Sequence, residues 1–299
     1  MRKNSISLAD SSVQLAPKIH SFRSFGLFMG YSNNEEAPDY SKSDLLWRYG
    51  PQTPTLEKFQ QNLLSGHICG DIRNKANKIS RHFEKIVLAE LSNRRLLKKR
   101  SIVYREEGDE LDLDRLYSGV PEHWKSHRPV LRPKQFIKVG ICGLQDFRKT
   151  SDDFVKMGAL ACCLSGILAK MGFSIEILVS LVGRTPSVDT PGEWTPAGLV
   201  FPIKAATEVV DMAKIMSIRF PGLVRHNGFR ALSQMGIPPH QLQTFQTPEE
   251  IANFCGLLNL DLFIPEDMPD LDDLEKSKPF YFKLTDDVIN SVWGKSLAK

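Results

Sequence analysis

The feature that most constrains the fold is a change of hydrophobic periodicity between residues 136 and 183. Apolar residues alternate with polar or small ones over residues 136–142, which is typical of a β-strand. From Ser151 the apolar spacing becomes helical, and Gly172 is placed to end that helix. Residues 174–182 are almost entirely apolar, as in a central strand that is buried on both faces. These segments predict a parallel βαβ unit.

Weaker signals of the same kind extend the pattern towards the C-terminus. Residues 199–203 and 260–264 are predicted strands, and residues 280–284 are predicted as a further strand or edge segment. Thr247, followed by proline and two glutamates, predicts a helix start with a capping box. We therefore expect a Rossmann-like α/β fold, with a mostly parallel sheet and helices on both faces.

The remaining sequence suggests three parts. Residues 1–54 are expected to be a partly irregular N-terminal arm, and the fold as a whole is expected to carry a helical N-terminal extension. Residues 55–134 are predicted to be a basic helical region followed by a connector with one helical turn at 105–134. Residues 135–299 are the predicted α/β domain. A hydrophobic content of 41% with 25% charged residues is ordinary for a globular protein.

Several classes of protein are disfavoured by what the sequence lacks. No apolar run reaches the roughly 18 residues that a membrane span needs. The five cysteines have no disulfide-like spacing, which favours reduced thiols and the cytoplasm of a cell. The chain has neither a dinucleotide fingerprint nor a Walker lysine loop, and no zinc-like ligand spacing. We expect no cofactor, no metal and no catalytic activity.

Charge is spread unevenly along a chain whose net charge is only +4. Residues 73–105 hold eleven basic residues against two glutamates, whereas residues 259–299 hold nine acidic residues against five lysines. The densest basic cluster is a candidate nucleic-acid-binding site and comprises Arg94, Arg95, Lys98, Lys99 and Arg100. The alternative is a solvated helix end, because cations are also stabilised at a helix C-terminus.

Aromatic residues interleaved with arginine form a second candidate binding feature. Arg23 lies among phenylalanines, and Trp47 directly precedes Arg48. Proteins that bind single strands stack bases on aromatic rings beside a positive groove. The alternative is that these aromatic residues pin an N-terminal arm onto the body of the protein.

Residues 108–124 and 133–180 resemble an uncharacterised domain of tailed-phage proteins that is itself distantly similar to von Willebrand factor A domains. The resemblance covers about residues 80–185 and implies a Rossmann-like sandwich. The metal-binding Asp-x-Ser-x-Ser loop of true von Willebrand A domains is replaced here by residues 140–144, Gly-Ile-Cys-Gly-Leu, so their metal site is not implied. With its basic helix, the whole chain is similar to the single-stranded-DNA-binding transcription factors of enquatro-like podoviruses.

These observations lead to one leading functional hypothesis and two alternatives. The resemblance implies a phage protein of the host cytoplasm that binds single-stranded DNA and recruits a phage RNA polymerase. The first alternative is a von Willebrand A-like adaptor for an AAA+ ATPase, without DNA binding. The second is an enzyme whose site lies at the strand ends, near the loop 143–151.

Overall fold

The structure is a computed structural model of the 299-residue chain. It describes residues 7–33, 61, 70–93, 101–106, 110–128, 136–144, 151–170, 173–187, 190, 192–208, 214–215, 222–265, 271 and 273–290. The chain divides into two compact units: one consists of residues 1–87 and 136–299, and the other of residues 88–135.

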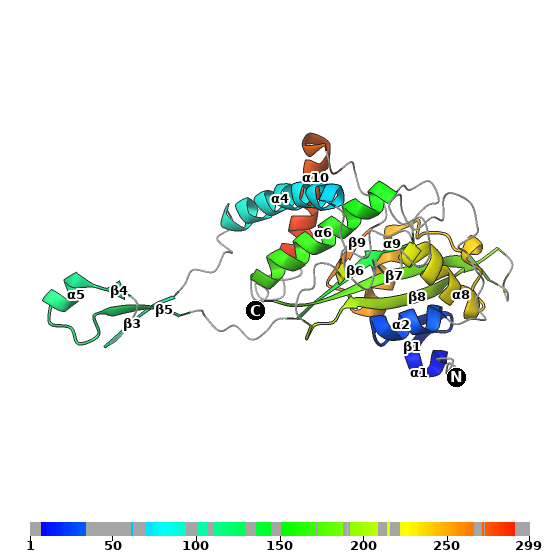
Figure 1. The fold of residues 1–299 in the computed structure, drawn as a ribbon, viewed down its shortest axis with the longest axis horizontal. Coiled ribbons are helices and arrows are strands. Elements are labelled where there is room, and N and C mark those ends of the chain that lie inside the picture. The colour runs from blue at the N-terminus through cyan, green and yellow to red at the C-terminus, as the bar shows by residue number, and fades with distance from the viewer. Residues whose placement is uncertain are drawn as a thin grey trace. The chain divides into compact units, whose positions relative to one another are not determined.

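A six-stranded, mostly parallel sheet forms the centre of the larger unit (Figure 1). The strands stand side by side in the order β1, β2, β8, β7, β6, β9. Their bounds are β1 Ser12–Ala16, β2 Ile19–Phe22, β6 Phe136–Cys142, β7 Ser174–Pro186, β8 Trp194–Lys204 and β9 Leu262–Ile264. The predicted mixed α/β class is therefore correct.

The predicted βαβ unit is present as β6, α6 (Ser151–Lys170) and β7. β6 and β7 are parallel, with Ile137 opposite Ile175 and Ile141 opposite Val179. Leu160, Leu164 and Val179 are buried, as predicted. β7 is buried along most of its length, in keeping with the apolar residues that predominate from Ile175 to Val182.

β8 runs antiparallel to β7, with which it forms a long two-stranded ribbon. The strand predicted at residues 199–203 is part of β8, which starts earlier, at Trp194. The connection from Pro186 at the end of β7 to Trp194 at the start of β8 is too short for a parallel pair, because a parallel crossover needs about a dozen residues or more. The strand predicted at residues 260–264 is confirmed as β9, which pairs in parallel with β6.

The N-terminal region contributes strands to the sheet, and the predicted helical extension is not seen in its described part. α1 (Leu8–Ser11) leads into β1, which pairs antiparallel with β2 around a turn at Pro17 and Lys18. β2 then pairs in parallel with β8. α2 (Phe25–Ser32) follows, with the Phe28 ring stacked on Phe201 of β8 at a centroid distance of 3.9 Å.

The two faces of the sheet have different covers. On one face, Leu178 and Val200 pack in a core cluster with Phe254 and Leu258 of α9 (Pro248–Leu258). The other face, which carries Phe201, is covered by α2 and by helices from the middle of the chain. These are α6, the π-helix η4 (Gly222–Gly228) and α8 (Phe229–Gln234), followed by the short 3₁₀ helix η5 (Pro239–Gln241).

The π-helix carries buried polar residues that fasten α2 to the body. The Asn227 Nδ2 donates to Ser32 Oγ at 3.0 Å, and the Arg230 Nε of α8 donates to the Ser32 carbonyl at 2.8 Å. Gln234 Nε2 donates to the Tyr31 carbonyl at 3.1 Å. Arg230 and Gln234, both of α8, thereby bond carbonyls at the C-terminal end of α2, where a helix leaves its last carbonyls without partners within the helix.

α4 (Gly70–Asn93) packs on α6, and α10 (Leu274–Ile289) packs on α4 (Figure 1). In α4, Ser80 Oγ donates to the Ala159 carbonyl of α6 at 3.4 Å. The Phe83 ring of α4 lies 5.3 Å from Tyr281 of α10. The prediction of a strand at residues 280–284 is wrong: Tyr281, Leu284 and Val288 are buried at helical spacing, and the Asp273 side chain caps the helix.

The smaller unit contains a three-stranded antiparallel sheet that the sequence did not predict. The order is β3 (Ser101–Arg105), β5 (Trp124–Arg128) and β4 (Glu110–Leu111). The one helical turn expected in this connector is α5 (Leu113–Tyr117). Residues 105–134 therefore include a small folded β-structure rather than only a linker.

Candidate functional site

Most residues of the predicted nucleic-acid site lie outside the described part of the chain. These are Arg94, Arg95, Lys98, Lys99, Arg100, Trp47 and Arg48. Arg23 is described: it is exposed between β2 and α2, and its backbone N–H donates to the Ser11 carbonyl at 3.0 Å. The structure therefore neither assembles nor separates the predicted set.

The smaller unit combines aromatic and charged side chains on its described elements. The Arg115 guanidinium of α5 lies 4.0 Å from the ring centroid of Tyr104 in β3. Tyr104 Oη donates to Asp112 Oδ2 at 3.3 Å, and Lys125 Nζ of β5 lies 3.3 Å from the same oxygen. Cation–π and ionic contacts thus join α5 to the sheet.

Asp112 organises this arrangement from the N-cap position of α5. Its Oδ1 accepts from the Arg115 backbone N–H at 3.2 Å. The backbone N–H of Arg115, with Lys125 and Tyr104, holds the pKa of Asp112 below its usual value. The carboxylate consequently stays ionised and keeps both Lys125 and Tyr104 in place.

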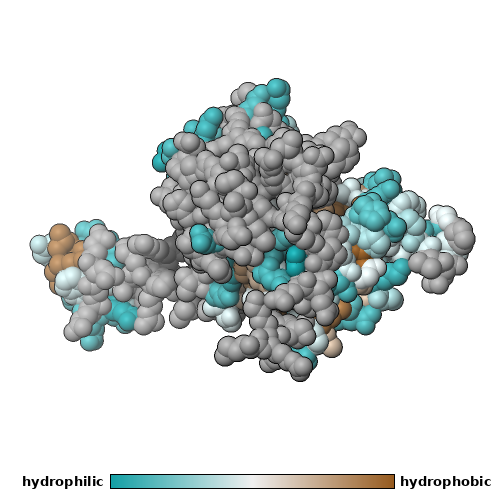
Figure 2. Space-filling view, turned by 45° about the vertical axis from the view of Figure 1, so that its right-hand side comes forward, coloured by the Kyte–Doolittle hydropathy of each residue, from teal (hydrophilic) through white to brown (hydrophobic). Residues whose placement is uncertain are grey.

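The outer side of α5 is apolar and open. Leu113 is 53% exposed, Leu116 38% and Tyr117 84%. A hydrophobic patch is visible on this unit in the space-filling view (Figure 2). Large exposed apolar and aromatic side chains on so small a unit make this side of α5 a candidate contact surface.

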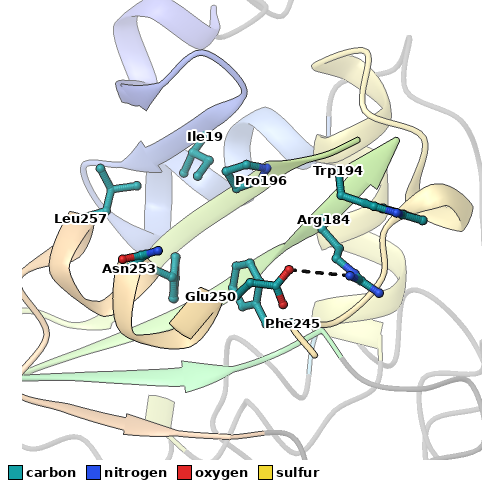
Figure 3. A pocket seen from close by; sticks show the side chains of 9 residues that line it. Ile19, Arg184, Trp194, Pro196, Phe245, Glu250, Asn253 and Leu257 are labelled. Atoms are coloured by element: carbon teal, nitrogen blue, oxygen red, sulfur yellow. Dashed lines mark ion pairs between the residues drawn. The ribbon is translucent and has the colours of Figure 1, made fainter. Parts of the chain in front are cut away.

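A groove in the larger unit is the second candidate site (Figure 3). It lies between α9 and the end of the β7–β8 ribbon, and its volume is about 320 Å³. We call it the α9 groove; it is lined by Ile19, Arg184, Trp194, Pro196, Phe245, Glu250, Asn253, Phe254 and Leu257. Trp194 and Leu257 at its rim are 41% and 39% exposed.

Arg184 of β7 is the organising charge of the α9 groove. Its Nη1 lies 3.6 Å from Glu250 Oε1, its Nη2 donates to Gln243 Oε1 at 3.3 Å, and its guanidinium lies 4.7 Å from the Trp194 ring centroid. Backbone bonds in both directions between Arg184 and Gln243 fix the position of this strand end. Within the described residues, the buried Arg184 Nε–H has no hydrogen-bond acceptor.

Glu250 belongs both to the groove and to the start of α9. Its Oε2 accepts from the backbone N–H of Gln246 at 2.7 Å and of Thr247 at 3.1 Å, while Thr247 Oγ1 accepts from the Glu250 N–H. This is the capping box that the sequence predicted. The Gln246 and Thr247 N–H groups and the Arg184 charge together hold the pKa of Glu250 below its usual value.

The strand-end loop that could hold an enzyme site is only partly visible. Gly143 and Leu144 are buried after β6, and residues 145–150 lie outside the described part. No group of three or more His, Cys, Asp or Glu side chains suited to a metal ion occurs among the described residues.

The groove residues were missed by sequence reasoning. Ile19, Arg184, Trp194 and Glu250 come from β2, β7, β8 and α9, and no local motif links them. The capping-box prediction identified Glu250, but only as a structural residue. Only the three-dimensional arrangement brings these residues together.

The fold and these surfaces define a mixed α/β protein that carries a separate small β-unit with exposed aromatic and apolar side chains. The chain belongs to the family described as a domain of unknown function (DUF7192), which matches residues 14–266. Neither a curated protein nor a solved structure matches the chain. Across the described segments, no helix is both long enough and apolar enough to cross a membrane.

Proposed function

We propose that the protein is a non-enzymatic single-stranded-DNA-binding transcription factor of a phage, which recruits a phage RNA polymerase in the host cytoplasm. The observation that carries this proposal is the composition of the smaller unit. Its exposed Tyr117 stands on the same helix as Arg115, whose guanidinium stacks on Tyr104. The basic cluster of residues 94–100 runs directly into β3 of this unit.

In this proposal the two kinds of side chain have different tasks. The basic residues would neutralise phosphates, which gives an affinity that falls with salt. An exposed tyrosine offers a face on which an unpaired base stacks, and this contribution depends little on base identity. The net negative charge of the region 259–299 would favour contact with a basic surface of the polymerase.

We also propose a von Willebrand A-like arrangement for the larger unit. Two features support it: the β6–α6–β7 unit and the strand order β8, β7, β6, β9. Among these four strands, β7, β6 and β9 run parallel to one another and β8 runs in the opposite direction. The residues after β6 include Gly143 and Leu144 in place of the usual metal ligands. A metal-dependent adhesion role is accordingly not part of the proposal.

A gel shift with single-stranded and double-stranded DNA tests the proposed function. The full chain should retard single-stranded DNA at low salt, and the variant Tyr117→Ala should bind it more weakly. Wild-type protein should bind an abasic oligonucleotide of the same length about as weakly as Tyr117→Ala binds the oligonucleotide that carries its bases. Absence of any shift with the wild-type protein at low salt would refute DNA binding.

The second candidate function is a protein-interaction adaptor for an AAA+ ATPase. It is favoured by the exposed Leu113 and Leu116 of α5, because such apolar side chains suit a protein surface better than a phosphate backbone. It predicts no DNA retardation, together with stable co-purification with an ATPase that is abolished by Leu116→Glu.

A further inference from the structure

We propose that the α9 groove binds an extended segment of a partner protein that presents one large apolar side chain next to a lysine or arginine. The groove lies in the larger unit, whereas Tyr117 and the basic cluster of residues 94–100, on which the proposed DNA binding rests, belong to the smaller one. This inference therefore stands whether or not the protein binds DNA.

The floor and rim of the groove are shaped for an apolar group. Ile19 and Phe254 are buried beneath it, and Phe245 packs against Phe254 with ring centroids 5.4 Å apart. Trp194 and Leu257 remain among the exposed large hydrophobic side chains and stand at opposite ends of the groove (Figure 3). A volume of about 320 Å³ is at the lower end of the range for ligand sites, which suits one large side chain with its adjoining backbone.

The charges around the groove favour a cation beside that apolar group. Glu250 lines the groove, and the exposed Glu193 and Glu249 are chain neighbours of lining residues. Arg184 and Glu250 form an ion pair at 3.6 Å, so their charges offset each other and Glu193 and Glu249 are left against Lys18. An excess of carboxylates attracts lysine or arginine and repels a phosphodiester chain.

Asn253 supplies the element that selects a peptide. It lies one turn after Glu250 and one turn before Leu257, so these three side chains follow one face of α9 along the groove (Figure 3). An exposed asparagine amide has one acceptor and two donor hydrogens, which is the pairing pattern of a peptide group. It can therefore bond the N–H and the carbonyl of one residue in an extended segment.

Addition of a further strand to β8 is a poorer explanation for the groove. Pro196 lies on the part of β8 that lines it, and proline has no N–H to donate to an added strand. Recognition is thus expected through side chains of α9 and Trp194 rather than through a backbone ladder.

Selection from a library of displayed random peptides on the full-length protein tests this inference. Enriched peptides should share a leucine, phenylalanine, methionine or tryptophan adjacent to lysine or arginine. A synthetic peptide of the enriched sequence should bind wild-type protein in fluorescence polarisation, and Leu257→Glu should weaken it at least about tenfold. Leu116→Glu, a substitution at a leucine of matched exposure (38% against 39%) in the other unit, should leave peptide affinity unchanged.

Three results would overturn the inference. They are failure to enrich any such motif, peptide binding that Leu257→Glu leaves intact, and displacement of the peptide from wild-type protein by a short oligothymidylate. The last result would assign the groove to nucleic acid. Circular dichroism shows whether Leu257→Glu perturbs folding. If it does, Asn253→Ala replaces it in the same binding test, because it changes an exposed polar residue.

Discussion

Gly198 is the position at which a single added methyl group should most disturb the sheet. It lies in β8, opposite Val182 of β7 and Ile19 of β2, so it is where the N-terminal hairpin joins the ribbon. Its φ is +146°, a conformation that side chains of L-residues rarely adopt. A Cβ at this position would lie 2.6 Å from Val182 Cα and would also overlap the Leu181 carbonyl oxygen.

The expected cost of Gly198→Ala follows from these two effects. Backbone strain at such a φ costs roughly 1–3 kcal/mol. Overpacking against backbone atoms, which cannot rotate away, adds about 1–3 kcal/mol. The sum, about 2–6 kcal/mol, is a large fraction of the roughly 5–15 kcal/mol by which domains are usually stable.

Urea unfolding followed by circular dichroism measures this change. Gly256→Ala is the matched control, because Gly256 lies within α9 and a Cβ there meets no atom within 4 Å. Alanine in a helix is favoured over glycine by roughly 0.5–1 kcal/mol, so the control should be slightly more stable than wild type. If Gly198→Ala unfolded at the same urea concentration as wild type, the described junction of β2 and β8 would be incorrect.

Three further predictions concern stability. Leu164→Ala should lower the free energy of unfolding by roughly 2–5 kcal/mol, because Leu164 is buried in α6, and an unchanged urea midpoint would exclude that burial. Thr247→Ala removes a side chain of the capping box and should cost about 1 kcal/mol, whereas Thr247→Ser should be nearly neutral. The pKa of Glu250 is lowered in the folded protein, so its stabilising contribution is present above the usual glutamate pKa and is lost as pH falls through the folded pKa. In Glu250→Gln, the free energy of unfolding should therefore fall less between neutral and acidic pH than it does in wild type. The same fall in both proteins would contradict this.

The elements that could be predicted from sequence are those whose residues follow one local rule. The β6–α6–β7 unit was predictable because its periodicity changes twice over a short stretch. The start of α9 was predictable because Thr247 and Glu250 form a capping box at a fixed spacing. In both cases the interactions that stabilise the element lie close together in the chain or repeat along it.

The elements that were missed depend on pairing between distant residues. The N-terminal hairpin joins the sheet through Ile19 opposite Gly198, which no local pattern reveals. The short connection after Pro186 is a signal for the antiparallel direction of β8. Because the strand was predicted to begin at residue 199 rather than at Trp194, the predicted connection was longer and did not carry this signal. In α10, residues 280–284 suggested a strand because all but Lys283 are apolar or aromatic. The buried residues Tyr281, Leu284 and Val288 instead recur at helical spacing.

The candidate sites show the same division. Cation-rich and aromatic segments can be found by inspection of the sequence, but the exposure of their side chains cannot. The apolar face of α5 was recognised only from the structure, in which Leu113 and Leu116 are exposed. Arg184 and Trp194 become parts of the α9 groove only when β2, β7, β8 and α9 come together in the fold. A binding surface composed of separate segments leaves no motif in the sequence.

The affinity of the full-length protein for single-stranded DNA, measured by fluorescence anisotropy at several salt concentrations, tests the proposed function most directly. If about three phosphates are neutralised, the logarithm of affinity should fall with the logarithm of salt at a slope near −2, at roughly 0.7 per contact. Charge reversal by Arg94→Glu with Lys98→Glu should reduce both slope and affinity. The same change of charge at Lys278 and Lys283 of α10 should do neither. No binding at low salt, or equal binding by the two double variants, would contradict a DNA-binding role for the basic cluster.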